Sequence, residues 1–403
     1  MSDEPTRVCS SFSSDIISDI LSRLPVKDLC RFRCVSKSWL SLILDPQFVK
    51  MHSKKTIENE DLMYQRRKLL FTDDKYDSLY SFNLDQFLDH YKDHPFLNGT
   101  VNCSGDDDAI GDDYDGDLVV TRIKLPGCFG DAEYWRVVSY CCGLVLLLDQ
   151  LTEEFVVANP ATRKYKKLPS VSAQFGGKTL MCDDGFCYDQ SADDFKVVNW
   201  TSSDDGMDVF VFALKTGSWT RMMRLPFRTG GFKSTGILLN GSLHWVMKRL
   251  DDNTRVIVSL NVAEAVVREI PLPPDFDVGQ RDLLKLVLFF NDSLGFTTLY
   301  GTGTVDEINL TIHSEFWVMK EYGVAESLTK IEFSSDLECF ILPFGYWKEN
   351  HALFCSQEGE QLVMYNSNDL SGHGLSIPGY PTITGAGFYV ESLVSLDDNR
   401  DFN

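Results

Sequence analysis

The chain has 403 residues, 43% of them hydrophobic and 12% aromatic, which is enough to bury a large core and to form more than one domain. Its 59 acidic residues against 38 basic residues give a formal net charge of -21, which argues against general affinity for nucleic acid or for anionic membranes. The 11 cysteines are odd in number and scattered, as expected for free thiols in an intracellular protein.

The N-terminal residues MSDEPTRVCSSFSSD are acidic and contain no long apolar run, so we expect no secretory signal. The longest apolar runs, such as LVLLL at 144–148, have the length of a strand and fall far short of a membrane-spanning helix. We therefore expect a protein of the cytoplasm, the nucleus or both, with no membrane partner.

The first segment with a clear period runs from Ser14 to Leu44, where apolar residues recur at steps of three and four. Ser13 or Ser14 is suited to cap a first helix, and Pro25 ends it and suits the first turn of a second. Ser36 is suited to cap a third helix, which we expect to stop at Asp45 and Pro46. The segment therefore predicts three short helices.

Three such helices form a unit too small to be stable alone, and no metal or disulfide pattern accompanies them. A partner protein is the simplest source of the missing buried area. Packing against the downstream domain is the alternative. The side chains expected to contact a partner are Ile16, Ile20, Leu21, Leu24, Pro25, Leu29, Val35, Trp39 and Leu42.

The segment IISDILSRLPVKDLCRFRCVSKSWLSLILDPQF resembles an F-box, the helical module by which substrate receptors dock on the Skp-type adaptor of cullin-based SCF ubiquitin ligases. Two positions depart from the family pattern. Phe12 and Ser13 stand where a Leu-Pro pair is usual, and Ser36 replaces a common Cys. The resemblance implies that the listed apolar residues bind the adaptor.

Downstream of about residue 60, short apolar runs separated by Gly, Asn, Asp and Pro predict β-strands. Pairs of strands that end in a Pro or a charged stop recur every 45 to 60 residues or so, a spacing typical of propeller blades. LYSFNLDQF at 79–87 is a candidate earlier copy, and GFYVESLVSL at 387–396 is a candidate closing strand. The predicted pairs lie at 155–169, 209–226, 256–273, 316–333 and 362–378.

Several of these stretches, such as VFALKTGSWTRM, NGSLHWV and LNVAEAVVREIPLP, resemble the F-box-associated interaction domain of plant F-box proteins. Leu328 replaces a Trp that is usual in that family. We therefore predict an α+β multidomain chain, with a small three-helix F-box and a mainly β domain that is a kelch-like propeller of about six degenerate blades. The predicted bounds are 8–54 for the F-box, 55–64 for a linker, 65–397 for the propeller-like domain and 398–403 for a tail.

No motif in the chain predicts a catalytic residue, a metal site or a cofactor. The acidic loop at 104–117 lacks the ligand order of an EF-hand, and His90 and His94 have no third ligand. Cys182 and Cys187 lack a second pair, and His244 beside Trp245 fits a structural role better than catalysis. The basic runs at 66–68 and 163–167 fit solvated faces or, alternatively, docking of an acidic or phosphorylated peptide.

These features favour a non-catalytic substrate receptor of an SCF ligase, with a Skp-type adaptor and cullin complex as partners and an unidentified protein as substrate. Two alternatives stay open: a propeller enzyme with an N-terminal oligomerisation unit, and an F-box scaffold that does not lead to degradation.

Overall fold

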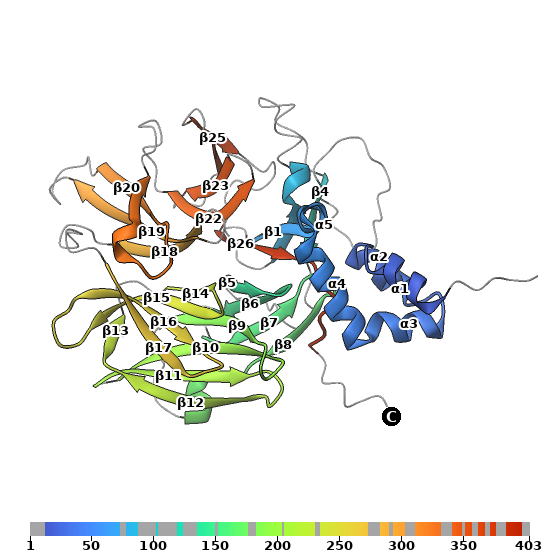
Figure 1. Ribbon diagram of the computed structural model, residues 1–403, viewed down its shortest axis with the longest axis horizontal. Helices are drawn as coiled ribbons and strands as arrows, with labels where there is room; N and C mark the ends of the chain where they lie inside the picture. Colours follow the sequence, from blue (N-terminus) through green and yellow to red (C-terminus); the bar gives the residue numbers. More distant parts are fainter. Residues whose placement is uncertain are drawn as a thin grey trace, which may run out of the picture.

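The computed structural model describes residues 13–72, 78–87, 102–103, 119–123, 135–149, 152–175, 183–203, 205–229, 234–272, 283–289, 293–302, 311–331, 341–348, 351–356, 362–366, 371–375 and 384–396. The described part consists of helices at the N-terminus, which project to one side, and a β domain (Figure 1). The acidic loop at 104–117 and the residues His90, His94 and Cys182 lie outside the described residues.

The N-terminal helical unit comprises residues Ser14–Arg66. Its first three helices confirm the predicted period, but two more follow without a break. The third helix ends at Leu44, as predicted, but Asp45 and Pro46 also begin the next helix. The Asp45 carboxylate caps that helix, and Pro46 occupies its first turn, where a missing N–H costs nothing. The predicted linker at 55–64 is therefore helical except at Asn59, which caps the fifth helix. The five helices are α1 (Ser14–Leu21), α2 (Val26–Phe32), α3 (Lys37–Leu44), α4 (Pro46–Glu58) and α5 (Glu60–Arg66).

The β domain is a propeller, and the described strands form six sheets, each of four or five strands. The first sheet combines both ends of the domain, because the C-terminal strand pairs antiparallel with the first strand after the helices. GFYVESLVSL at 387–396 therefore does supply a closing strand, over its first residues. The first sheet contains β1 (Arg67–Thr72), β2 (Leu79–Asn83), β3 (Asn102–Cys103), β4 (Val119–Ile123) and β26 (Thr384–Val390).

The other five sheets are antiparallel and follow the chain in order. The second contains β5 (Trp135–Cys141), β6 (Leu144–Asp149), β7 (Phe155–Asn159) and β8 (Lys164–Lys167), followed by α7 (Val171–Phe175). The third contains β9 (Asp184–Asp189), β10 (Asp194–Ser203), β11 (Gly206–Ala213) and β12 (Ser218–Leu225). The fourth contains β13 (Phe227–Thr229), β14 (Ile237–Leu239), β15 (Ser242–Arg249), β16 (Arg255–Asn261) and β17 (Val266–Pro271).

The fifth sheet contains β18 (Leu283–Phe289), β19 (Ser293–Thr302), β20 (Thr311–Met319) and β21 (Leu328–Ile331), with a short 3-10 helix at Ala325–Ser327. The sixth contains β22 (Ile341–Lys348), β23 (His351–Ser356), β24 (Leu362–Asn366) and β25 (Ser371–Leu375). In each of these five sheets, the strand pair predicted from the sequence supplies the last two strands.

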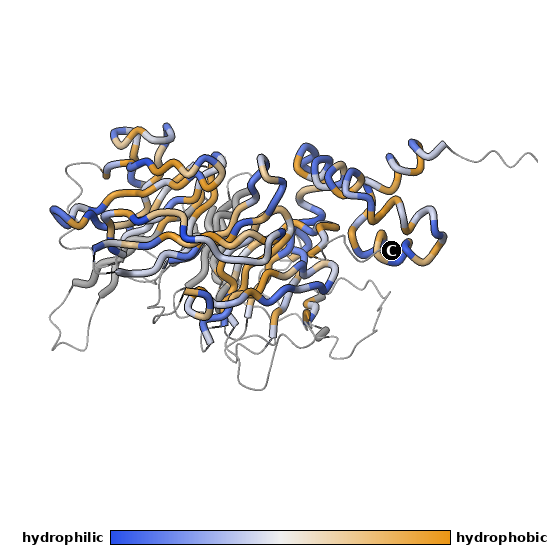
Figure 2. The backbone as a smooth tube through the Cα atoms, turned by 90° about the horizontal axis from the view of Figure 1, so that it is seen from below, coloured by the Kyte–Doolittle hydropathy of each residue, from blue (hydrophilic) through white to orange (hydrophobic). Residues whose placement is uncertain are grey.

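The sheets close into a ring through one strand of each sheet. β5 contacts β9, β9 contacts β14, β14 contacts β18, β18 contacts β22, and β22 contacts β26, which in turn contacts β5. Apolar side chains fill the spaces between neighbouring sheets. Leu146, Phe155, Phe212 and Trp219 lie in one such cluster, and Trp200 and Trp245 stack edge to face in the next. Figure 2 shows these hydrophobic strands beside the helical unit.

Candidate functional site

Large exposed apolar side chains are concentrated in the helical unit. Ile16 and Ile20, one turn apart on α1, are 48% and 53% exposed, and Val35 between α2 and α3 is 60% exposed. Leu40 and Leu44 form a second pair with the same spacing on α3. These five residues are called the exposed apolar group below. Apolar surface that is left exposed is a candidate for protein interaction, so the group is the candidate docking surface.

The residues predicted to contact an adaptor fall into three classes. Ile16, Ile20, Pro25 and Val35 are exposed. Leu24, Trp39 and Leu42 are partly buried and pack against the core of the helical unit. Leu21 and Leu29 are completely buried in that core, where they support the surface from within. Leu40 and Leu44 are exposed apolar residues of α3 that the predicted set does not include, although they stand at i, i+4 spacing.

Caps fix where the helices begin, and therefore which side chains face outward. The Ser13 hydroxyl accepts a hydrogen bond from the Ile16 backbone N–H, and the Ser36 hydroxyl accepts one from the Trp39 N–H. Pro25 stands at the N-cap of α2 with extended backbone. Between α2 and α3, the edge of Trp39 packs on Phe32 with ring centroids 5.4 Å apart. The caps and this ring pair set the register of α1 and α3.

A buried arginine ties the helices to one another and to the propeller. Arg66, 2% exposed, donates from Nη2 to the carbonyl oxygens of Leu24 (2.9 Å) and Ser22 (3.4 Å), and from Nη1 to the Thr56 hydroxyl. The Arg66 carbonyl accepts a hydrogen bond from the Glu391 N–H, just after β26. One residue therefore joins the α1–α2 turn, α4 and the C-terminal strand.

A neutral histidine lies beside this arginine. The Nε2 atom of His52 is 3.1 Å from the Leu24 carbonyl oxygen, and Nδ1 is buried without a hydrogen-bond partner in the described part of the chain. Burial, followed by the positive charge of Arg66, lowers the pKa of His52 to about 4. Burial also raises the pKa of Glu391, although Lys68 and Arg66 oppose that shift.

The segment after β26, residues 391–396, packs against the helical unit. Leu393 is buried in the same cluster as Leu21, Val26 and Ile43. The Asn159 side chain donates to the carbonyl oxygens of Ser392 (3.0 Å) and Val394 (2.8 Å).

The β5–β6 turn comes equally close to this segment. Gly143 has φ of +82°, and a Cβ built on it would lie 2.2 Å from the Ser392 hydroxyl oxygen. Glycine is therefore required here for its backbone conformation and for space.

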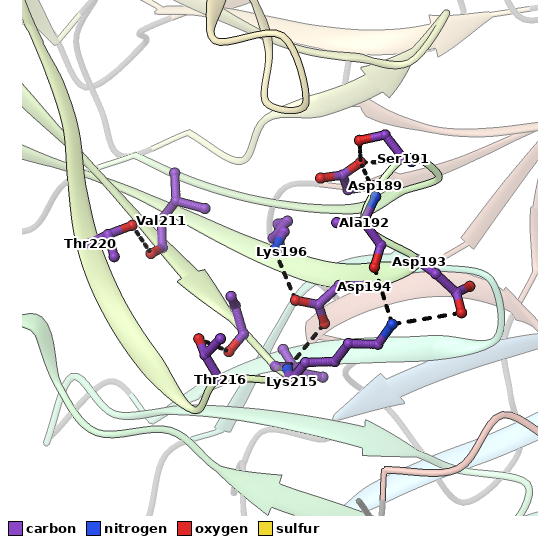
Figure 3. A network of polar contacts seen from close by, with 12 residues as sticks. Asp189, Ser191, Ala192, Asp193, Asp194, Lys196, Val211, Lys215, Thr216 and Thr220 are labelled. Carbon is purple, nitrogen blue, oxygen red and sulfur yellow. Dashed lines mark hydrogen bonds and ion pairs between the residues drawn. The ribbon is translucent and has the colours of Figure 1, made fainter.

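An ion pair forms a second contact between helices and propeller. Lys50 of α4 lies 2.8 Å from a carboxylate oxygen of Asp193, in the turn between β9 and β10. Lys215 and the Tyr188 hydroxyl also contact Asp193, and Figure 3 shows the Lys215 contact within the polar network of this turn. The Lys50 hydrogen bond and then the Tyr188 hydrogen bond lower the pKa of Asp193 to about 2. The contact is exposed, so it orients the unit more than it stabilises it.

Other residues singled out from the sequence have structural surroundings. His244 is buried, with Nδ1 3.1 Å from the Ile237 carbonyl oxygen and Nε2 2.6 Å from the Tyr322 hydroxyl oxygen, which supports the structural interpretation. The basic run at 163–167 forms the edge strand β8, where lysines are typical of a protected edge. In the part of the chain that the structure describes, no group of three His, Cys, Asp or Glu residues is placed to hold a metal. No helix there is long and apolar enough to cross a membrane.

Two family profiles match the chain. The profile of the F-box domain matches residues 9–51, and the profile of the F-box associated beta propeller domain matches residues 119–393. Among solved structures, the nidogen/laminin complex aligns with a TM-score of 0.47 and 8% identity over 81% of this chain and 99% of that chain.

Two relatives from Arabidopsis thaliana align along most of the chain. F-box protein CPR1 is 27% identical, over 94% of this chain and 88% of its own length. The F-box/kelch-repeat protein At3g23880 is 24% identical, over 98% of this chain and 100% of its own length. Because the propeller profile alone covers more than half of the sequence, the chain belongs to the family of F-box proteins that carry an F-box associated beta propeller domain.

Proposed function

We propose that this protein is the substrate-recognition subunit of an SCF ubiquitin ligase. The F-box helices dock on a Skp-type adaptor, and the propeller presents a target protein for ubiquitination and proteasomal degradation. The observation that carries the proposal is the exposed apolar group, because it lies on helices within the segment matched by the F-box profile. Such a receptor needs no catalytic residue, since it acts by raising the effective concentration of target near ubiquitin charged on another subunit.

The structure favours particular substitutions for a test of adaptor binding. Leu24 and Trp39 are partly buried, so changing them would weaken the core of the helical unit as well as any interface. Ile20 and Val35 are exposed, and a carboxylate at either position is solvated in the free protein but buried in an apolar interface.

The first prediction concerns these exposed positions. We expect the double change Ile20→Glu and Val35→Glu to weaken binding to a purified Skp-type adaptor by at least about a hundredfold, because two charges would be desolvated without partners. Isothermal titration calorimetry measures the effect. Ile57→Glu is the matched control, because Ile57 is 70% exposed but lies on α4, outside the exposed apolar group. Unchanged adaptor binding by the double variant would contradict the proposal.

Degradation is tested separately from docking. In cells, the Ile20→Glu and Val35→Glu variant should still bind its target but lengthen the target's lifetime relative to wild type, measured by cycloheximide chase. A target whose lifetime does not depend on adaptor binding would instead indicate a scaffolding role.

A further inference from the structure

Three cations stand in register across neighbouring strands of the fourth sheet. Arg228 of β13 is paired with Lys248 of β15, and Lys248 is paired with Arg255 of β16. Residues directly opposite one another in antiparallel strands project from the same face, so the three side chains share a face. Like charges in this arrangement repel one another and cost stability. These three residues are called the cationic row below.

The cationic row lies at the end of the propeller away from the helical unit. The helical unit contacts Asp193, in the turn that follows the first strand β9 of its sheet. The equivalent turn of the fourth sheet, at Asn240 and Gly241, follows β14. Strand β15 therefore starts at the helical end and runs away from it, which places Lys248 near the opposite end, where the helices leave the propeller uncovered.

The row faces the fifth sheet. Val246 and Ile257 pack in one cluster with Leu286 and Phe296 of that sheet. Lys248 follows Val246 by two positions and Arg255 precedes Ile257 by two, so strand alternation puts both on this face.

A polar group of the fifth sheet faces the same boundary. Thr298 follows Phe296 by two positions, and therefore lies on the face of its sheet that looks toward the fourth sheet. Thr298 is fully buried, and its hydroxyl has no hydrogen-bond partner within the described residues. Among the described residues, the boundary therefore holds both cations and a buried hydroxyl that has no partner.

Within the described part of the chain, the charges of Arg228 and Lys248 are not matched as neighbouring charges are. Arg249, next to Lys248, pairs with Glu269, and Arg221 and Arg224 both pair with Asp208. By contrast, neither Arg228 nor Lys248 forms an ion pair within the described part of the chain. The contact of the Arg228 side chain is a 3.4 Å hydrogen bond to the Leu250 carbonyl oxygen. Burial, followed by Arg255 and Arg228, lowers the pKa of Lys248.

We propose that the cationic row binds an anionic segment of the target protein, in which carboxylates or phosphorylated side chains lie against Lys248 and Arg228. Guanidinium and ammonium groups bind carboxylate and phosphate oxygens through charge-assisted hydrogen bonds. The inference rests on the proposed function, since it names the chemistry of the target that the receptor recognises.

The test measures binding of labelled peptides to the full chain by fluorescence anisotropy, without the adaptor. The probes are an oligoglutamate peptide, a Gly/Ser peptide with a single phosphothreonine, and the same Gly/Ser peptide without phosphate. We expect one or both anionic probes to bind and the neutral one not to bind. Preference for oligoglutamate would identify acidic side chains as the ligand, and preference for phosphothreonine a phosphorylated target. Absence of binding by both anionic probes overturns the proposal.

Variants locate the site. Arg228→Gln with Lys248→Gln should weaken binding of the anionic probe by at least about tenfold. The matched control is Lys164→Gln with Lys167→Gln on β8, which removes the same charge from exposed positions and should change binding less than about twofold. Lys248→Arg retains the charge and should bind as wild type does. Equal losses in both double variants, or no loss in the first, would contradict the proposal.

A stability measurement separates loss of binding from loss of fold. Because the row is a line of like charges, the Arg228→Gln and Lys248→Gln variant should melt at or above the wild-type temperature when no peptide is present. It should also bind the Skp-type adaptor as the wild type does, so a failure of the cationic row is distinguishable from a failure of the receptor function.

Discussion

His52 shows how one buried residue couples the helical unit to pH. Its ring is neutral in the folded protein, because Nε2 donates to the Leu24 carbonyl and Nδ1 has neither solvent nor, among the described residues, an acceptor for a second proton. The folded pKa of about 4 lies below the ordinary value near 6.5. As the pH falls, the unfolded chain takes up a proton first, so stability falls between about pH 6.5 and pH 4.

The His52→Gln variant tests this coupling. Its amide can still donate to Leu24 but does not titrate, so the variant should lose less stability on acidification. Between pH 7 and pH 5, the unfolding free energy of the wild type should fall by about 2 kcal/mol more than that of the variant. Urea unfolding at the two pH values measures the difference. Parallel losses in both proteins would show that the pKa of His52 is not lowered by folding.

At the scale of elements, the segment after β26 packs against the helical unit, and the turn after β7 holds this segment in position. Asn159, at the end of β7, accepts hydrogen bonds from the Ala161 and Thr162 N–H groups and donates to Ser392 and Val394. The same side chain therefore shapes its own hairpin and fixes the segment that carries Leu393 into the helical core.

Asn159→Ala should lower the unfolding free energy by about 2 to 4 kcal/mol. The carbonyl oxygens of Ser392 and Val394 would lose their donor, and the N–H groups of the turn would lose their acceptor. Asn261 is a natural control: it ends β16, the equivalent strand of the fourth sheet, and its side chain accepts from the Glu264 N–H within its own turn. Asn261→Ala should cost about 1 kcal/mol or less. Urea unfolding compares the two variants, and equal costs would mean that the contact with the C-terminal segment contributes nothing.

The sequence was sufficient for elements with strong local signals. Ser13 and Ser36 cap helices as predicted, and the recurring pairs of strands are the last two strands of five sheets. Helices α4 and α5 were missed because Asp45 and Pro46 carry the same signal at the end of one helix and at the start of the next. The contact of Leu393 with the helical core joins opposite ends of the chain, so no local pattern could reveal it. The role of Arg66 was not predictable for the same reason, because its hydrogen-bond partners lie far from it in the sequence.

The downstream domain contributes buried surface to the helices. One side of the helical unit packs on Leu393 and on the turns that carry Ala161 and Asp193, which is the alternative that the sequence left open. The exposed apolar group stays uncovered all the same. At the scale of the whole molecule, the F-box is therefore held at one end of the propeller while the cationic row lies toward the other.

Ring closure makes the propeller depend on its last strand. β26 is hydrogen-bonded to β1 and contacts both β5 and β22. A chain ending at residue 383 should therefore lose the cooperative thermal transition seen by circular dichroism and become sensitive to proteolysis. A chain ending at residue 396 keeps every described element and should retain that transition. Cooperative unfolding of the shorter chain would show that closure through β26 is dispensable.

The pairing of β26 with β1 also orders events in time as the protein is made. Translation makes the helical unit and β1 before residues 384–396, so the helices of a nascent chain lack their C-terminal contacts until the intervening propeller strands have been made. Arg66 and the helical core receive the contacts of Glu391 and Leu393 only after those strands. Products that terminate before residue 384 therefore lack the segment that packs against the helices.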